Sequence, residues 1–88
     1  MKISTVAISK ETVYKIYKKH GVSFSEVKDV LLGNPYVSKT KFEAYLAIGK
    51  TNRYITIIFA YDHEIADIIT AYPSSDWQIN LFKRKKEK

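Results

Sequence analysis

The chain has 88 residues and a formal net charge of +6, and it contains no cysteine. This length supports one domain with a single core of modest size. The absence of cysteine excludes a disulfide framework, a thiol nucleophile and a cysteine-ligated metal, and the two histidines, His20 and His63, give no metal-ligand spacing. We therefore expect no metal and no cofactor. No apolar run approaches the roughly 20 residues of a membrane span, and the first residues do not form a signal peptide, so we expect a cytoplasmic protein with no membrane partner.

Positive charge is concentrated at the C-terminal end. Residues 83–88 contain five basic side chains and one acidic side chain, which leaves residues 1–82 with a formal charge of only +2. We therefore expect a single domain over residues 1–82 and a basic tail over 83–88. The tail either contacts a polyanion such as RNA or serves as a solubilising terminus.

The first elements in chain order are a short β-branched segment and a helix. Residues 3–8 form either an edge strand or an extended lead-in. Ser9 is typical of a helix N-cap, and Glu11 lies in the first turn, where the helix dipole favours a negative charge. The helical face that follows has the spacing i, i+3, i+4, i+7 and consists of Val13, Ile16, Tyr17 and His20.

A junction between two helices is predicted at residues 19–26. Gly21 is suited to the left-handed conformation that closes a helix. Ser23 and Glu26 have the S-x-x-E spacing of a capping box, and Val22 and Val27 have the spacing of a hydrophobic staple. The second helix then covers residues 24–32 and ends at Gly-Asn-Pro.

From Pro35 onward the hydrophobic period changes to two, which is typical of strands. One strand is predicted around the alternating residues Phe42, Ala44, Leu46 and Ile48, a central strand over residues 54–61, and another strand over 65–72. Short connections favour an antiparallel meander. Ser75 and Gln78 have capping-box spacing, and Trp77 and Leu81 are typical of a short final helix. The fold class is therefore α+β: two N-terminal helices, a three- to four-stranded antiparallel sheet and a short C-terminal helix.

Three short segments carry a resemblance to a known family. Lys-His-Gly-Val-Ser-Phe at residues 19–24, with Glu26, is followed by Ala-Ile-Gly at 47–49 and Ile-Ile-Thr-Ala at 68–71. Over about residues 8 to 75 the chain resembles the BrnT-like toxins, which are small ribonucleases of bacterial toxin–antitoxin pairs with a RelE-like fold. The resemblance implies RNA as the substrate and a cognate DNA-binding antitoxin as the partner. Charge complementarity predicts an acidic surface on that antitoxin.

Three positions depart from the family. BrnT-like toxins carry arginine where this chain has Ala44, Asp67 and Tyr72, whereas Glu43 matches the family. Either the catalytic residues differ from those of the family, or the fold is kept without catalysis.

RNA cleavage by its own 2′-hydroxyl needs a base, an acid and a cation near the phosphate. His20 is a candidate acid or base, because imidazole exchanges protons near neutral pH, and its alternative role is to stabilise a helix C-terminus. Tyr72 either donates a proton, stacks on a base or is an ordinary core-edge residue. Glu43 is a candidate base if it lies near Arg53 on the open sheet face, and a cross-strand ion pair is its alternative role.

The remaining catalytic candidates are Arg53 and Thr70. Arg53 is the only arginine outside residues 83–88, and its guanidinium can bind a phosphate through two hydrogen bonds. Thr70 is expected to share a strand face with Tyr72 and Ile68, because alternate residues of a strand point the same way.

The candidates for RNA binding are cationic or aromatic, and each has an ordinary structural alternative. The lysines are also typical of a solvated surface, and tyrosine is also a good strand former. The set consists of Lys19, Lys50, Arg53, Tyr45 and Arg84.

Two functions follow from these observations. The first is the toxin component of a type II toxin–antitoxin pair, acting as a small metal-independent endoribonuclease. The alternative is a non-catalytic RNA-binding or protein-interaction module that keeps the toxin fold.

Overall fold

The computed structural model describes residues 1–40 and 42–86 and has the predicted α+β class. Within these residues, three helices and five strands occur in the order β1 (Thr5–Ala7), α1 (Lys10–His20), α2 (Phe24–Leu32), β2 (Tyr36–Lys39), β3 (Tyr45–Lys50), β4 (Tyr54–Asp62), β5 (Ile65–Pro73) and α3 (Asp76–Lys86). None of the helices in the described ranges is long and apolar enough to cross a membrane.

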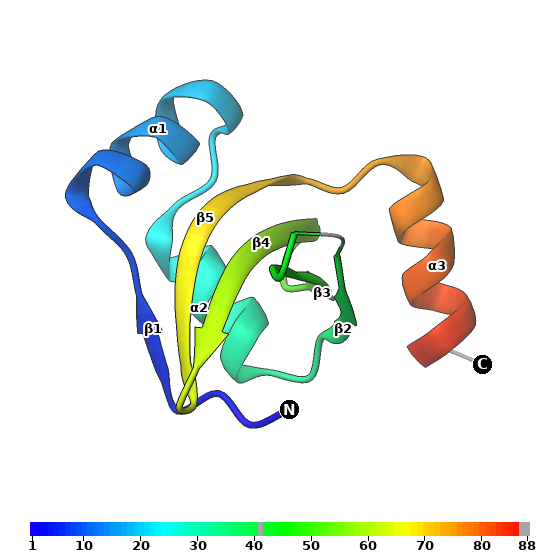
Figure 1. Ribbon diagram of the computed structural model, residues 1–88. Coiled ribbons are helices and arrows are strands. Elements are labelled where there is room, and N and C mark those ends of the chain that lie inside the picture. The colour runs from blue at the N-terminus through cyan, green and yellow to red at the C-terminus, as the bar shows by residue number, and fades with distance from the viewer. Residues whose placement is uncertain (41, 87–88) are drawn as a thin grey trace.

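The five strands form one mixed sheet in the order β1-β5-β4-β3-β2 (Figure 1). Strands β2 to β5 are antiparallel neighbours, whereas β1 pairs with β5 in parallel. The prediction of a three- to four-stranded antiparallel sheet is therefore wrong in the number of strands and in the direction of the edge strand β1. Both edge strands contribute: β2 was not predicted, and the parallel pairing of Thr5 with Ile65 joins segments so distant in the chain that it leaves no local sequence signal.

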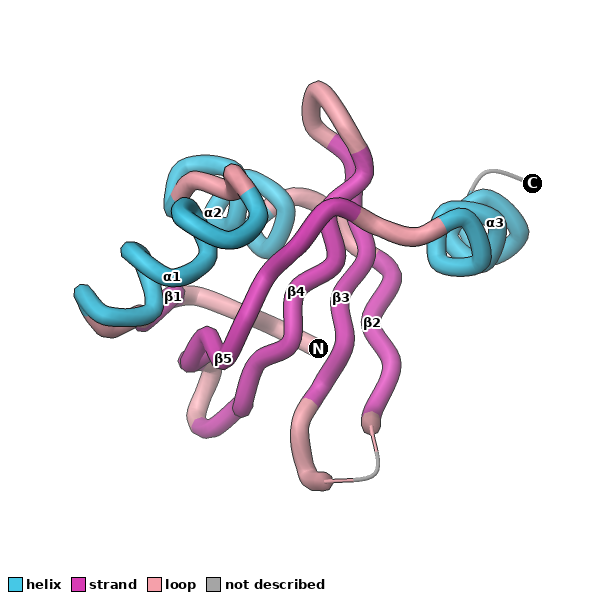
Figure 2. Tube along the Cα trace, turned by 90° about the horizontal axis from the view of Figure 1, so that it is seen from above, coloured by secondary structure: helices cyan, strands magenta, loops and turns pink. Residues whose placement is uncertain are grey.

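Helices cover both faces of the sheet (Figure 2). Helices α1 and α2 pack on the face formed by Ala47, Ile57 and Ala71, which are neighbours across β3, β4 and β5. Helix α3 contacts β3 and β2 and covers part of the opposite face, where Thr56 is fully buried. Strand β4 is therefore central, as its nearly continuous apolar sequence predicts.

The α1–α2 junction has the predicted structure. Gly21 has a φ of +66°, and the amides of Gly21 and Val22 donate to the last turn of α1. The Ser23 hydroxyl and the Glu26 carboxylate form the reciprocal bonds of the capping box. Val22 and Val27 are fully buried beside it. The junction therefore fixes where the C-terminus of α1 lies relative to the sheet.

A bulge in β5 changes the face on which two candidate residues lie. Ile68 pairs with Phe59, but Thr70 pairs with the preceding residue, Ile58, so Ile69 is an extra residue in the strand. The expectation that Thr70 and Tyr72 share a face with Ile68 is therefore wrong. Ile68 packs in the core under the helices, and Thr70 and Tyr72 lie on the opposite face.

Two boundaries also differ from the prediction. Phe42 and Ala44 precede β3 rather than belonging to it, and Glu43 has a φ of +56°, which no strand accommodates. Helix α3 extends to Lys86, so four residues of the predicted basic tail are helical, while 87–88 lie outside the described residues. The final helix is therefore as long as α1, with 11 residues each.

Candidate functional site

Three of the predicted catalytic residues come together at one end of the sheet. His20 ends α1, Arg53 lies in the loop between β3 and β4, and Tyr72 is near the end of β5. The ring centroids of His20 and Tyr72 are 6.0 Å apart. Arg53 Nη2 donates to the carbonyl oxygen of Gly21, the residue after His20, at 2.7 Å. The β3–β4 loop rises between α2 and α3 in Figure 2.

Arg53 is held by the capping-box glutamate. Its Nε donates to Glu26 Oε2 and its Nη2 to Glu26 Oε1, each at 3.0 Å. The Arg53 guanidinium lowers the pKa of the Glu26 carboxyl below its ordinary value, and the hydrogen bonds from Ser23 act in the same direction. The carboxylate in turn raises the pKa of Arg53. No local pattern predicts this ion pair, which joins the β3–β4 loop to the start of α2.

The ion pair leaves part of the guanidinium available. The Nη1 group of Arg53 donates to none of the described residues, and the side chain is 42% exposed. Arg53 is thus fixed in position and still offers two N–H groups to an anion.

Tyr72 ends a hydrogen-bonded network beneath α3. Gln78 Nε2 donates to the Tyr72 hydroxyl at 3.1 Å, and Gln78 Oε1 accepts from Thr56 Oγ1 and from the Ser75 amide, each at 2.9 Å. Thr56 also bonds Ser74 Oγ at 2.7 Å. Sequence reasoning missed both Gln78, the hydrogen-bond partner of Tyr72, and Thr56, which bonds Gln78. The capping-box spacing was the one signal that placed Gln78 near this end of the sheet.

The other catalytic candidates differ in their distance from this cluster. Thr70 is half-buried on the same face as Tyr72, two residues along β5. Glu43 lies in the β2–β3 connection, at the opposite end of the sheet from the Arg53 loop (Figure 2). The structure does not bring Glu43 and Arg53 together.

The RNA-binding candidates are similarly divided. Lys19 is exposed beside His20 in the last turn of α1. Lys50 and Lys83 approach the Tyr54 ring at 5.1 and 5.9 Å, which brings cations from β3 and α3 together.

The last two RNA-binding candidates are Arg84 and Tyr45. Arg84 is exposed on α3. Tyr45 instead stacks on Phe59 at 5.8 Å and meets Tyr61 edge-on at 6.0 Å, on the side of the sheet that faces α1 and α2. Tyr45 is therefore not part of the cluster around Tyr72.

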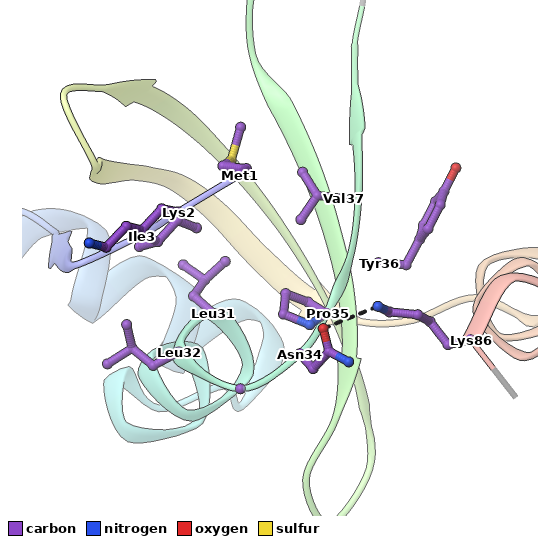
Figure 3. Close-up of a pocket in the computed structure, with 11 residues that line it drawn as sticks. Met1, Lys2, Ile3, Leu31, Leu32, Asn34, Pro35, Tyr36, Val37 and Lys86 are labelled. Carbon is purple, nitrogen blue, oxygen red and sulfur yellow. Dashed lines mark hydrogen bonds between the residues drawn. The ribbon is translucent and has the colours of Figure 1, made fainter.

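A cavity of about 540 Å³ lies away from this cluster (Figure 3). It lies between the N-terminal segment, the end of α2 and β2, where Lys86 Nζ donates to Asn34 Oδ1. Its walls include Leu31, Pro35 and Val37, and none of the described residues that line it is a histidine or carries a side-chain carboxylate. No group of three His, Cys, Asp or Glu side chains in the described part of the chain is arranged to hold a metal ion.

Comparison with solved structures gives an informative match. No protein-family model and no curated protein matches the sequence. The crystal structure of BrnT, a ribonuclease toxin of Brucella abortus, superposes with a TM-score of 0.65 and 26% sequence identity. The match covers 86% of this chain and 99% of BrnT. The resemblance predicted from the sequence is therefore confirmed, and the chain has a BrnT-like toxin fold.

Proposed function

We propose that this chain, on its BrnT-like toxin fold, is the toxin of a type II toxin–antitoxin pair and a metal-independent endoribonuclease. The observation that carries the proposal is the convergence of His20, Arg53 and Tyr72 at one end of the sheet. These side chains supply a base, a cation and an acid, which are the groups that cleavage of RNA by its 2′-hydroxyl requires. The similarity to a solved ribonuclease toxin supports the same activity.

The proposed mechanism assigns one role to each side chain. The His20 imidazole accepts the proton of the 2′-hydroxyl as the 2′-oxygen attacks phosphorus. The Tyr72 hydroxyl donates its proton to the 5′-oxygen as the bond from phosphorus to that oxygen breaks. The Arg53 Nη1 group donates to the non-bridging oxygens, where negative charge increases in the transition state. The products are a 2′,3′-cyclic phosphate and a 5′-hydroxyl.

RNA approaches this site along the charged side chains around it. Lys19 flanks His20, and the Lys50–Tyr54–Lys83 group lies on the side of the β3–β4 loop that faces α3. Phosphates are attracted to these cations. An antitoxin with an acidic surface neutralises the same surface, and both partners meet in the cytoplasm.

In vitro cleavage of a labelled RNA by the purified chain tests the activity. His20→Ala and Tyr72→Phe should each slow cleavage by roughly 10²–10⁴-fold. His63→Ala is the matched control, because His63 is exposed in the β4–β5 turn and bonds only Asp62 among the described residues. Intact RNA after incubation with the folded wild-type chain would contradict the proposal.

Induced expression in bacteria tests the biological role. The wild-type chain should arrest growth and shorten messenger RNA, and Tyr72→Phe should relieve the arrest. If a gene next to that of this chain encodes a small ribbon-helix-helix protein and the two form a pair, coexpression of that protein should restore growth.

The alternative function is a non-catalytic module on the same fold. It is favoured by Ala44 and Asp67, which stand at two family arginine positions, and by the ion pair that occupies part of Arg53. This alternative predicts RNA or protein binding without strand cleavage, so the same labelled-RNA experiment separates the two functions.

A further inference from the structure

The network beneath α3 fixes the direction of the hydrogen bonds that the Gln78 side chain makes. Gln78 is 3% exposed, so its side-chain amide cannot exchange partners with bulk water. The backbone amide of Ser75 can only donate, and it lies 2.9 Å from one end of the Gln78 side chain. That end must be the carbonyl oxygen, because an NH₂ group there would place two donors face to face.

The other end of the Gln78 amide is therefore the NH₂ group, and it faces Tyr72. Nε2 lies 3.1 Å from the Tyr72 hydroxyl oxygen. An NH₂ group has no acceptor, so the phenolic oxygen must accept this bond. The single phenolic proton is then left over, and within the described ranges Tyr72 donates to no other group.

We propose that Gln78 is a positioning residue that turns the proton of Tyr72 outward, toward a phosphodiester of bound RNA. That the ligand is RNA rests on the proposed function, whereas the directions of the hydrogen bonds rest on the network alone. In the cleavage step this proton goes to the departing 5′-oxygen, and His20 holds the proton of the 2′-hydroxyl. The phenolate and the imidazolium that remain return to their starting forms by proton exchange with water.

The bond to Tyr72 goes beyond what capping of α3 requires. The cap needs only the bond from the Ser75 amide to Gln78 Oε1, and a glutamate at the same position would provide it equally well. A glutamate would instead accept from Tyr72 and hold the phenolic proton inside the network. The amide nitrogen is the feature that leaves the proton free.

A binding experiment tests the inference without requiring cleavage. The probe is a fluorescent 2′-O-methyl RNA, which has no 2′-hydroxyl and so cannot be cut. Tyr72→Phe and Gln78→Met should each weaken binding roughly fivefold to tenfold, the loss expected for one hydrogen bond. The double variant should bind no more weakly than Tyr72→Phe alone, because Gln78 acts only through the hydroxyl. Independent losses that multiply would overturn the inference.

A cleavage experiment tests whether the outward proton reaches the leaving oxygen. The probe is the RNA that the wild-type chain cuts, with sulfur in place of the 5′-oxygen at the cleaved linkage. Thiolate leaves without protonation, so Gln78→Met and Tyr72→Phe should slow cleavage of ordinary RNA but not of the sulfur-containing RNA. Equal slowing on both RNAs would show that Gln78 acts only on structure.

Two variants separate these effects from loss of folding. Thr56→Val is the matched control, because it removes the Thr56 bond to Gln78 Oε1 but leaves the bond from Gln78 Nε2 to the Tyr72 hydroxyl in place, so it should lower stability but not RNA affinity. Gln78→Glu keeps the helix cap and should lose at least as much cleavage as Tyr72→Phe while melting near the wild-type temperature.

The combined outcomes distinguish the two proposals. Suppose that the chain binds RNA without cutting it, and that the double variant loses no more affinity than Tyr72→Phe alone. The endoribonuclease proposal then fails and the role of Gln78 stands. If the chain cuts RNA but the affinity losses of Tyr72→Phe and Gln78→Met multiply in the double variant, the role of Gln78 fails and the endoribonuclease proposal stands. Absence of RNA binding by the folded wild-type chain overturns both.

Discussion

The two faces of the sheet are closed by different kinds of contact. On the face toward α1 and α2, the buried side chains are apolar, with Phe59, Ile57 and Val27 fully inaccessible to water. On the face toward α3, the two buried polar side chains of the described residues, Thr56 and Gln78, bond each other. The face toward α1 and α2 is thus stabilised by non-directional apolar burial. The face toward α3 also buries polar groups, whose directed hydrogen bonds end on Tyr72.

The largest expected difference between the two faces is in the stability lost when a β4 side chain is truncated to alanine. Phe59→Ala leaves a cavity in the face under the helices and should lower the free energy of unfolding by about 3–5 kcal/mol. Its neighbour Ile58 is half-buried on the opposite face, and Ile58→Ala should cost only about 1–2 kcal/mol. Urea denaturation of both variants measures the difference. Equal losses would show that the face toward α3 carries as much of the core.

A smaller loss is expected from the polar network. Thr56→Val keeps the volume of the side chain but removes its bonds to Gln78 and Ser74. Because Gln78 Oε1 keeps the bond from the Ser75 amide, the loss of stability should be only about 1–2 kcal/mol. Thermal unfolding at neutral pH measures it. A more stable variant would mean that the network is maintained at a cost to folding.

The ion pair between the β3–β4 loop and α2 should contribute less than the network. A double-mutant cycle of Glu26→Gln and Arg53→Met should give a coupling energy of about 0.5–1 kcal/mol, because Arg53 is partly exposed. Glutamine at position 26 keeps the capping geometry, so the cycle isolates the charge.

The same pair predicts a dependence on pH with a definite sign. The folded-state pKa of Glu26 is below its ordinary value near 4.5, so its contribution is complete above that value. The contribution is lost as the pH falls through the folded-state pKa. The difference in stability between wild type and Glu26→Gln should therefore shrink in acid, and a difference that stays constant down to pH 2 would contradict the assignment.

The sequence predicts the parts of the fold that depend on neighbours in the chain. The α1–α2 junction is an example, because the conformation of Gly21 and the Ser23–Glu26 bonds involve residues at most a few positions apart. Long-range pairings were missed because no local pattern encodes them. Strand β1 pairs with β5, about 60 positions later in the chain. The bulge in β5 places Tyr72 on the face opposite Ile68, whereas simple alternation predicts that they share a face.

The candidate site follows the same division. Residue chemistry identified His20, Arg53 and Tyr72 as candidates, and the fold brings them together. Their partners could not be found from the sequence, because Arg53 meets Glu26 only when the β3–β4 loop folds against α2, and Tyr72 meets Gln78 only when α3 docks.

The smallest expected effect concerns the end of the sheet that the site does not reach. Glu43 lies in the connection before β3 with a φ of +56°, and alanine in that conformation meets nearly the same backbone strain. Glu43→Ala should therefore change the free energy of unfolding by less than about 0.5 kcal/mol and leave RNA cleavage at the wild-type rate. Unfolding and labelled-RNA assays on one preparation measure both. A cleavage rate reduced as much as by Tyr72→Phe would place the acid–base chemistry at the opposite end of the sheet.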